Sequence, residues 1–255
     1  MVRYEVSRGR ATLTINQPHR RNPLSVKTLE DLLSHTRQAL DDPTVRVLVY
    51  TGAGDRAFCA GADLDGGIFD SPVGMHRQRG ALADLFRLMI RGGKPTIARV
   101  NGHALGGGFG LMCACDLVIC TEDAKLGTPE VRVGVWPMLI SAVLARTIPR
   151  RALLEMMMTG RLLTPAEALA LGAVSRVVKP DQLDQAVSEA AEALAAQSPA
   201  ALQLGKDTFW MVTDLGIDAG LDFLAGGLTA TLITEDAQEG ISAFVEKRAP
   251  AWSGS

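Results

Sequence analysis

The stretch Asn101-Gly102-His103-Ala104-Leu105-Gly106-Gly107-Gly108-Phe109-Gly110 decides how this chain of 255 residues is interpreted. Three consecutive glycines, 106–108, come before the apolar segment 111–115, which is predicted to be helical. Glycines leave main-chain N–H groups bare at a helix start, where the positive end of the helix dipole also lies. Such amides would stabilise a carbonyl oxygen that becomes an enolate. The same glycines would equally permit close packing of a helix on a strand, and the stretch alone favours neither interpretation.

Two further segments could complete such a site. Phe58-Cys59-Ala60-Gly61-Ala62-Asp63-Leu64 is a small-residue loop after a predicted strand. One amide from each loop would make an oxyanion hole with two donors, although this segment in isolation is more typical of a tight turn. Gly127-Thr128-Pro129-Glu130 places a carboxylate beside a stiff turn, among apolar residues at 131, 133, 135 and 136. Apolar surroundings raise the pKa of a glutamate and suit it to proton transfer near neutrality. A solvated loop glutamate is the commoner case.

The pattern around these segments alternates strands with helices, which predicts an α/β core with parallel strands. Helices are expected from about Ser25 to Asp42-Pro43, over 81–91, and after a turn at 101–108. The Gly-rich segment 66–80 is expected to be a mobile loop. Strands are expected over 2–7 and 10–16, turning at Gly9, and over 45–51, 96–100 and 117–120.

Beyond about residue 137 the pattern becomes nearly all helical. Thr164-Pro165-Ala166-Glu167 is a capping box with proline at the first helical position, and Ser198-Pro199 opens another helix in the same way. Residues 199–252 carry apolar-periodic helices with no strand to cover. This part packs either on its own core or on a neighbouring subunit, and the pattern does not choose. We therefore divide the chain into a core over 1–195 and a C-terminal helical region over 196–255, to which the family resemblance described below assigns oligomerisation.

Composition limits the classes of protein to which the chain can belong. It is 47% hydrophobic and 21% charged with a net charge of −2, which is typical of a globular protein with no nucleic-acid surface. The first residues, Met1 to Glu5, do not form a signal peptide, because charge precedes any apolar run. No stretch approaches the roughly 18 apolar residues of a membrane span. The expected location is the cytoplasm.

Cofactor and metal sites are not indicated. The four cysteines lack any CxxC spacing and are expected to be reduced core thiols, and the four histidines show no ligand spacing. Gly52-x-Gly54-x-x-Ala57 follows a strand, as a dinucleotide-binding motif would, but that motif needs a helix immediately after it. The segment 58–63 does not look helical, so we expect no dinucleotide site.

Taken together, in order and spacing, the three segments resemble the enoyl-CoA hydratase/isomerase (crotonase) family over essentially the whole chain. The resemblance starts at Thr14-Ile15-Asn16-Gln17-Pro18 with Arg21-Asn22 and reaches Phe244-Val245-Glu246-Lys247-Arg248. It implies an α/β, crotonase-like (ClpP/crotonase) spiral of ββα units, with a C-terminal helical part that builds homotrimers or homohexamers. It also implies an acyl-CoA substrate, with no cofactor beyond the coenzyme A of the substrate itself.

The resemblance also assigns residues. The N–H groups of Ala62 and Gly107 would form the oxyanion hole for the thioester, and Glu130 would be the acid/base. The segment that should lie along the coenzyme A comprises Ala60, Ala62, Asp63, Leu64 and Asp65, and Lys247 is a weaker candidate for contact with its phosphates.

One position departs from the family's pattern. Hydratases of the family commonly carry a second glutamate on the helix after the glycines, where this chain has Gly110. Paired carboxylates suit hydration, whereas one carboxylate suits a proton shift between Cα and Cγ. Family members with glycine here are usually called hydratases, so hydratase is our first interpretation. A Δ3,Δ2-enoyl-CoA isomerase with Glu130 as sole proton shuttle is the second, and a non-catalytic acyl-CoA-binding protein is the third.

Arg132 supports a further hypothesis about the substrate. It lies two residues past Glu130, so in an extended segment the two side chains would share a face. Arg132 would then receive a second carboxylate on the acyl group. An exposed arginine without such a role is the commoner case.

Overall fold

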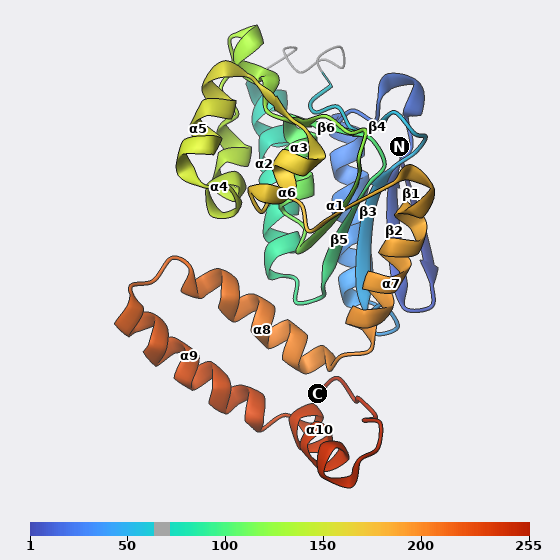
Figure 1. The fold of residues 1–255 in the computed structure, drawn as a ribbon, viewed down its shortest axis with the longest axis vertical. Helices are drawn as coiled ribbons and strands as arrows, with labels where there is room; N and C mark the ends of the chain where they lie inside the picture. Colours follow the sequence, from blue (N-terminus) through green and yellow to red (C-terminus); the bar gives the residue numbers. More distant parts are fainter. Residues whose placement is uncertain (64–71) are drawn as a thin grey trace.

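The computed structural model describes residues 1–63 and 72–255, and its framework is two β-sheets wrapped by helices (Figure 1). The six-stranded sheet has the order β1-β2-β3-β5-β7-β10, in which only the β1–β2 pair is antiparallel. The four-stranded sheet has the order β4-β6-β8-β9, with β8–β9 antiparallel. The predicted α/β class with mainly parallel strands is confirmed.

The large sheet consists of β1 Val2–Ser7, β2 Arg10–Ile15, β3 Val47–Gly52, β5 Thr96–Val100, β7 Leu117–Thr121 and β10 Arg176–Val178. All residues of β3 are buried, as expected for a parallel strand covered on both faces. Val47 and Val49 pack toward α7 (Leu183–Ala195), whereas Leu48 and Tyr50 belong to the main core on the other face. The sheet is therefore a central layer between helices.

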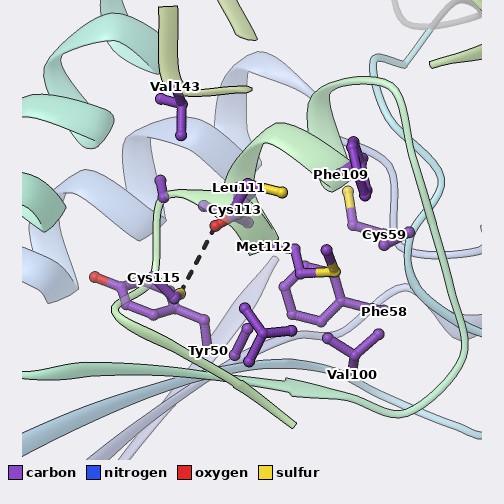
Figure 2. Close-up of a cluster of buried hydrophobic side chains, with 14 of the residues drawn as sticks. Tyr50, Phe58, Cys59, Val100, Phe109, Leu111, Met112, Cys113, Cys115 and Val143 are labelled. Atoms are coloured by element: carbon purple, nitrogen blue, oxygen red, sulfur yellow. Dashed lines mark hydrogen bonds between the residues drawn. The ribbon is translucent and has the colours of Figure 1, made fainter. Parts of the chain in front are cut away.

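The small sheet is built from very short strands: β4 Ala57–Cys59, β6 His103–Leu105, β8 Leu126–Gly127 and β9 Leu162–Leu163. Short helix α3 (Gly107–Cys113) begins two residues after β6. Phe109 and Met112 of this helix belong to the same buried cluster as Phe58 of β4 and Val100 of β5, and Figure 2 shows this cluster. The core thus holds α3 against both sheets.

The remaining helices of the core are α1 Val26–Asp41, α2 Pro72–Arg91, α4 Met138–Thr147, α5 Arg150–Thr159 and α6 Pro165–Ala170, with 3₁₀ turns η1 Pro18–Arg20, η2 Pro129–Val133 and η3 Pro180–Gln182. Ser25 caps α1 by accepting a hydrogen bond from the Thr28 N–H at 3.1 Å. The predicted capping box at Thr164 and Glu167 is confirmed, with both reciprocal bonds present. All four cysteines are buried free thiols.

Three predictions about secondary structure are wrong in part. Residues 72–80 belong to α2 rather than to a loop, while 64–71 lie outside the described residues. The chain after residue 137 is not all helical, because β9 and β10 return to the sheets. The turn predicted over 101–108 contains β6, a strand too short for any periodic pattern to show.

The C-terminal part consists of α8 Pro199–Val212, α9 Ile217–Leu232 and α10 Glu235–Glu246, and it extends away from the sheets as an arm (Figure 1). A cavity of about 650 Å³, lined in part by Cys113, Lys206 and Trp210, lies between α8 and the core. By length and composition no single helix in the described ranges is suited to span a membrane. Helices α9 and α10 are long and apolar enough only when they are taken together, and the pair is bent by 70°. Many large apolar side chains of the arm are exposed, among them Phe209, Ile217, Leu221, Leu228, Ile233, Phe244 and Val245.

The carboxylate of Asp236 fixes the base of this arm. It is 1% exposed and accepts hydrogen bonds from the Ser198 hydroxyl at 2.7 Å and from the main-chain N–H groups of Ala200, Ser253 and Gly254 at 3.3, 2.8 and 2.9 Å. Burial by itself raises the pKa of this carboxyl, but the hydrogen bonds outweigh burial and hold the pKa below its usual value. Asp236 therefore joins the start of α8, the start of α10 and the residues that follow α10.

Asp236→Ala is expected to destabilise the protein by about 3 kcal/mol, because hydrogen bonds to a charged acceptor are strong and their buried donors would lose their partner. Thermal unfolding at pH 7 measures this, with Asp222→Ala, an exposed carboxylate on α9, as the matched control. Because the folded-state pKa lies below the unfolded value, this contribution is present at neutral pH and disappears as pH falls through the folded pKa. Equal melting temperatures for the two variants would contradict this role of Asp236.

Candidate active site

The two small-residue loops meet in the structure. Strands β4 and β6 pair in parallel, with Cys59 opposite Ala104, so the loops that follow them leave the same edge of the sheet. Gly61 has φ +95°, and a methyl group on it would lie 2.9 Å from the Leu105 carbonyl oxygen and 3.5 Å from the Gly107 nitrogen. Only glycine suits this position, because it combines a left-handed conformation with close main-chain contact.

Both main-chain amides predicted as donors are available at this junction. Gly107 is the first residue of α3, where N–H groups have no acceptor within the helix. Ala62 stands between two bonded neighbours, since the Leu24 N–H donates to the Gly61 oxygen at 2.8 Å and the Asp63 N–H donates to the Leu24 oxygen at 3.3 Å. Neither the Ala62 nor the Gly107 N–H donates a main-chain or side-chain hydrogen bond to another described residue.

Glu130 lies beside the same junction. Glu130 is the second residue of η2, which follows β8. The N–H of Gly106, the residue after β6, donates a hydrogen bond to the oxygen of Gly127 in β8 at 2.9 Å. A methyl group on Gly106 would lie 2.9 Å from Oε1 of Glu130, so the carboxyl group lies directly against this glycine. Gly106 also has φ +53°, which favours glycine independently.

The Glu130 carboxyl group is partly shielded from water. The residue is half-buried, and within the described part of the chain its buried Oε2 atom has no hydrogen-bond partner. Burial raises the pKa of this carboxyl above its usual value, opposed only by a hydrogen bond from its own main chain. A raised pKa favours a carboxyl group that can both give up and take back a proton.

Two side chains that the sequence did not single out for a role hold the Ala62 loop and the strand β4 that precedes it. Arg20 in η1 forms a bidentate ion pair with Asp63, with N···O distances of 2.9 and 2.8 Å. Asn22 is fully buried and donates to the carbonyl oxygens of Ala57 at 2.7 Å and Ala53 at 3.0 Å. Asn22 was part of the motif that carried the family resemblance, whereas the pairing of Arg20 with Asp63 left no local signal in the sequence.

The structure separates the residues predicted to lie along the substrate. Ala62 is exposed at the junction, Ala60 is half-buried beside it, and the buried Asp63 side chain faces Arg20. Leu64 and Asp65 lie outside the described residues. Lys247 ends α10, at the opposite end of Figure 1 from β4, β6 and α3. Within a single chain, Lys247 therefore does not lie next to the Ala62 loop. The contact of Lys247 with the phosphates of coenzyme A stays a prediction.

Gly110, the position that lacks the second glutamate, is closely packed. A methyl group on Gly110 would lie 2.7 Å from Cβ of Ile140 in α4, closer still to Cγ2 of that residue, and 3.4 Å from Cζ of Phe86 in α2. Ile140 and Phe86 are 3% and 5% exposed. The space that a side chain at 110 would need is thus filled by an apolar contact.

The premise of the Arg132 hypothesis is wrong. Residues Pro129–Val133 form a 3₁₀ helix rather than an extended segment, so side chains two positions apart do not share a face. The Arg132 side chain instead packs near Gly160, where a methyl group would lie 3.0 Å from its Cγ and Nε atoms. We therefore do not assign a second substrate carboxylate to Arg132.

The arrangement can hold a carbonyl oxygen with two amides and move a proton beside it. No cluster of three or more His, Cys, Asp or Glu residues suited to a metal ion occurs within residues 1–63 and 72–255. Ala62 and Gly107 each offer one N–H donor to this site, and Glu130 offers one poorly solvated carboxyl group.

The chain is similar to known proteins over essentially its whole length. The family model for enoyl-CoA hydratase/isomerase matches residues 5–255. The carnitinyl-CoA dehydratase of Proteus mirabilis is 35% identical over 97% of each chain, and the (E)-benzylidenesuccinyl-CoA hydratase of Thauera aromatica is 35% identical over 100% of this chain and 99% of its own. The crystal structure of an enoyl-CoA hydratase from Bacillus anthracis superimposes with a TM-score of 0.94 at 30% identity, covering 100% of this chain and 99% of that one. The chain therefore belongs to the enoyl-CoA hydratase/isomerase family and has the crotonase fold.

Proposed function

We propose that this protein is an enoyl-CoA hydratase that adds water to, or removes it from, the 2-enoyl double bond of an acyl-CoA thioester. The observation that carries the proposal is the position of the Glu130 carboxyl group, which lies against Gly106 beside the N–H groups of Ala62 and Gly107, and these donate to no other described residue. Two of the compared relatives are named as a dehydratase and a hydratase, and these names support addition or removal of water as the reaction.

In the proposed reaction, the N–H groups of Ala62 and Gly107 hold the thioester oxygen while negative charge develops on it. The oxygen of a water molecule bonds to C3 of the enoyl group, and the electron pair of the double bond moves into the thioester as an enolate. Glu130 supplies a proton to C2, and the proton released by the water returns to Glu130. Dehydration runs through the same steps in reverse.

A second candidate function is supported by the packing at Gly110. With Ile140 in the place of a second carboxylate, Glu130 is the one carboxyl group that we assign to the chemistry. A single carboxyl group is sufficient to remove a proton from C2 of a 3-enoyl-CoA and return it to C4. This would give Δ3,Δ2-enoyl-CoA isomerase activity through the same enolate.

One assay distinguishes these functions. The purified protein is offered 2-enoyl-CoA and 3-enoyl-CoA separately, and the absorbance of the conjugated enoyl thioester is followed. Loss of absorbance from the first substrate indicates hydration, and a gain from the second indicates isomerisation. Tight binding of both without any change would contradict the proposed enzyme and support a non-catalytic acyl-CoA-binding protein.

We also propose that the arm mediates homo-oligomerisation. Its exposed apolar side chains include Phe244 and Ile217, which are 86% and 77% exposed, and apolar surface of this kind is typical of a subunit contact. Lys247 at the end of the arm would then contact a coenzyme A held by another copy rather than by its own chain. Sedimentation at micromolar concentration would test for the expected trimer or hexamer.

A further inference from the structure

Leu24 is bonded to both sides of Ala62 through its main chain. Its N–H donates a hydrogen bond to the Gly61 oxygen at 2.8 Å, and its oxygen accepts one from the Asp63 N–H at 3.3 Å. Leu24 and Ala62 form an isolated parallel bridge, which sets the register of the Ala62 loop against residue 24. The two hydrogen bonds therefore fix the main chain on each side of the Ala62 N–H.

The side chain of the same residue reaches the second proposed donor. A methyl group on Gly107 would lie 3.1 Å from Cδ1 of Leu24, so this carbon packs against the start of α3. Among the described residues, no other side chain comes within 4 Å of that position. Leu24 is 2% exposed and belongs to the main core. One buried residue thus contacts the segments that carry both amides, through its main chain at Ala62 and through its side chain at Gly107.

Leu24 is itself anchored by its neighbours in the chain. Ser25, the next residue, caps α1 by accepting a hydrogen bond from the Thr28 N–H at 3.1 Å. Two residues before Leu24, Asn22 is fully buried, and its Oδ1 atom accepts a hydrogen bond from the Gln17 N–H at 3.0 Å. Because the chain is bonded on both sides of it, Leu24 has a fixed position relative to α1.

We propose that Leu24 is a positioning residue, whose side chain sets the separation between the N–H groups of Ala62 and Gly107 and thereby the fit of the thioester oxygen between them. The inference rests on the proposed function, because it concerns the same two amides. Two donors stabilise an oxyanion best when each lies about 2.7–3.1 Å from the place that the oxygen takes in the transition state. A changed separation therefore lowers kcat more than it changes KM, since the charge on the oxygen is largest in the transition state.

The test uses three variants that differ in what reaches Gly107. Leu24→Val removes the Cδ atoms and with them this contact, whereas Leu24→Met keeps an unbranched side chain of sufficient length. Leu29→Val is the matched control, because Leu29 in α1 is 1% exposed and loses the same atoms.

Turnover of 2-enoyl-CoA is measured for all three variants and for wild type. We expect kcat of Leu24→Val to fall about tenfold while KM changes by less than about twofold, because misplacing one donor weakens the transition state. We expect kcat of Leu24→Met and Leu29→Val to stay within about threefold of wild type. An unchanged kcat in Leu24→Val would overturn the proposal. An equal loss of kcat in Leu29→Val would overturn it too, because the effect would then come from loosened packing in general.

A second measurement needs no turnover. Infrared difference spectra of bound butanoyl-CoA, with and without an isotope label at the thioester carbonyl carbon, give the frequency of its C=O stretch. Two strong hydrogen bonds lower this frequency below that of the free thioester. We expect the frequency in Leu24→Val to return toward the free value, and the frequency in Leu24→Met and Leu29→Val to match wild type.

This frequency separates failure of the inference from failure of the proposed function. If wild type turns over no enoyl-CoA, the proposed function fails, and the carbonyl frequency alone decides the role of Leu24. The same frequency in wild type and Leu24→Val would reject that role. A wild-type frequency equal to that of the free thioester would reject it as well, because the two amides would then not hold the oxygen.

Discussion

Gly107→Pro is expected to lower kcat for an enoyl-CoA thioester by about 10²- to 10³-fold, the usual effect of removing one oxyanion donor. Proline deletes the N–H of residue 107 and nothing else of the helix's hydrogen bonding, because Gly107 is the first residue of α3 and its amide has no acceptor there. The expected loss is in kcat, since charge on the thioester oxygen develops mainly in the transition state.

Gly107→Ala is the matched control, because it keeps the N–H while adding a side chain at the same position. Its methyl group would lie 3.1 Å from Cδ1 of Leu24, which is the movable end of a side chain, so a small adjustment accommodates it. We expect kcat of this variant within about tenfold of wild type. Full turnover by a correctly folded Gly107→Pro protein, judged by circular dichroism and melting temperature, would show that the Gly107 amide does not hold the oxygen.

Glu130→Gln is expected to reduce kcat by about 10³-fold, within the range lost when a positioned acid/base is removed. Glutamine preserves the shape of the side chain beside Gly106 but cannot exchange a proton. Because Oε2 has no partner among the described residues, the substitution breaks no other side-chain contact of that atom. Binding of the substrate should remain, so the dissociation constant of a non-reacting acyl-CoA is measured alongside turnover.

The pH profile gives an independent check on Glu130. Isomerisation begins with removal of a proton from C2, which requires the carboxylate form, so kcat/KM should fall as pH falls through the pKa of Glu130. Burial raises that pKa, and the fall should therefore occur above the ordinary glutamate value of 4.5. A Glu130→Gln protein that retains this limb of the profile would assign it to another group.

Much of the fold was predictable because its long elements have strong local patterns. Strands β1, β2, β3, β5 and β7 lie within two residues of the predicted ranges, since each combines β-branched residues with flanking turn residues. The caps at Ser25, Thr164 and Ser198 are likewise visible in the sequence, because a cap is defined by residues that are neighbours in the chain. Strands of two or three residues, such as β8 and β9, are too short to show a period.

In the candidate site too, the sequence predicted only the features that a local motif marks. The amide pair and Glu130 were predicted from motifs, and the structure brings those segments together, although their roles stay predictions. The pairing of Asp63 with Arg20 and the packing of Ile140 on Gly110 join segments far apart in the chain, so no local pattern could indicate them. The error at Arg132 arose because a stiff turn with proline was treated as extended, whereas the chain there winds into a 3₁₀ helix.

The loop that carries Ala62 is positioned from outside itself, by Leu24 and by the ion pair between Arg20 and Asp63. The geometry of the amide at 62 consequently depends on the docking of residues 18–24. If this early segment detaches locally, the central sheet can stay intact while one of the two proposed amide donors is displaced. We therefore expect any activity that uses both donors to be lost on warming before the molecule as a whole unfolds.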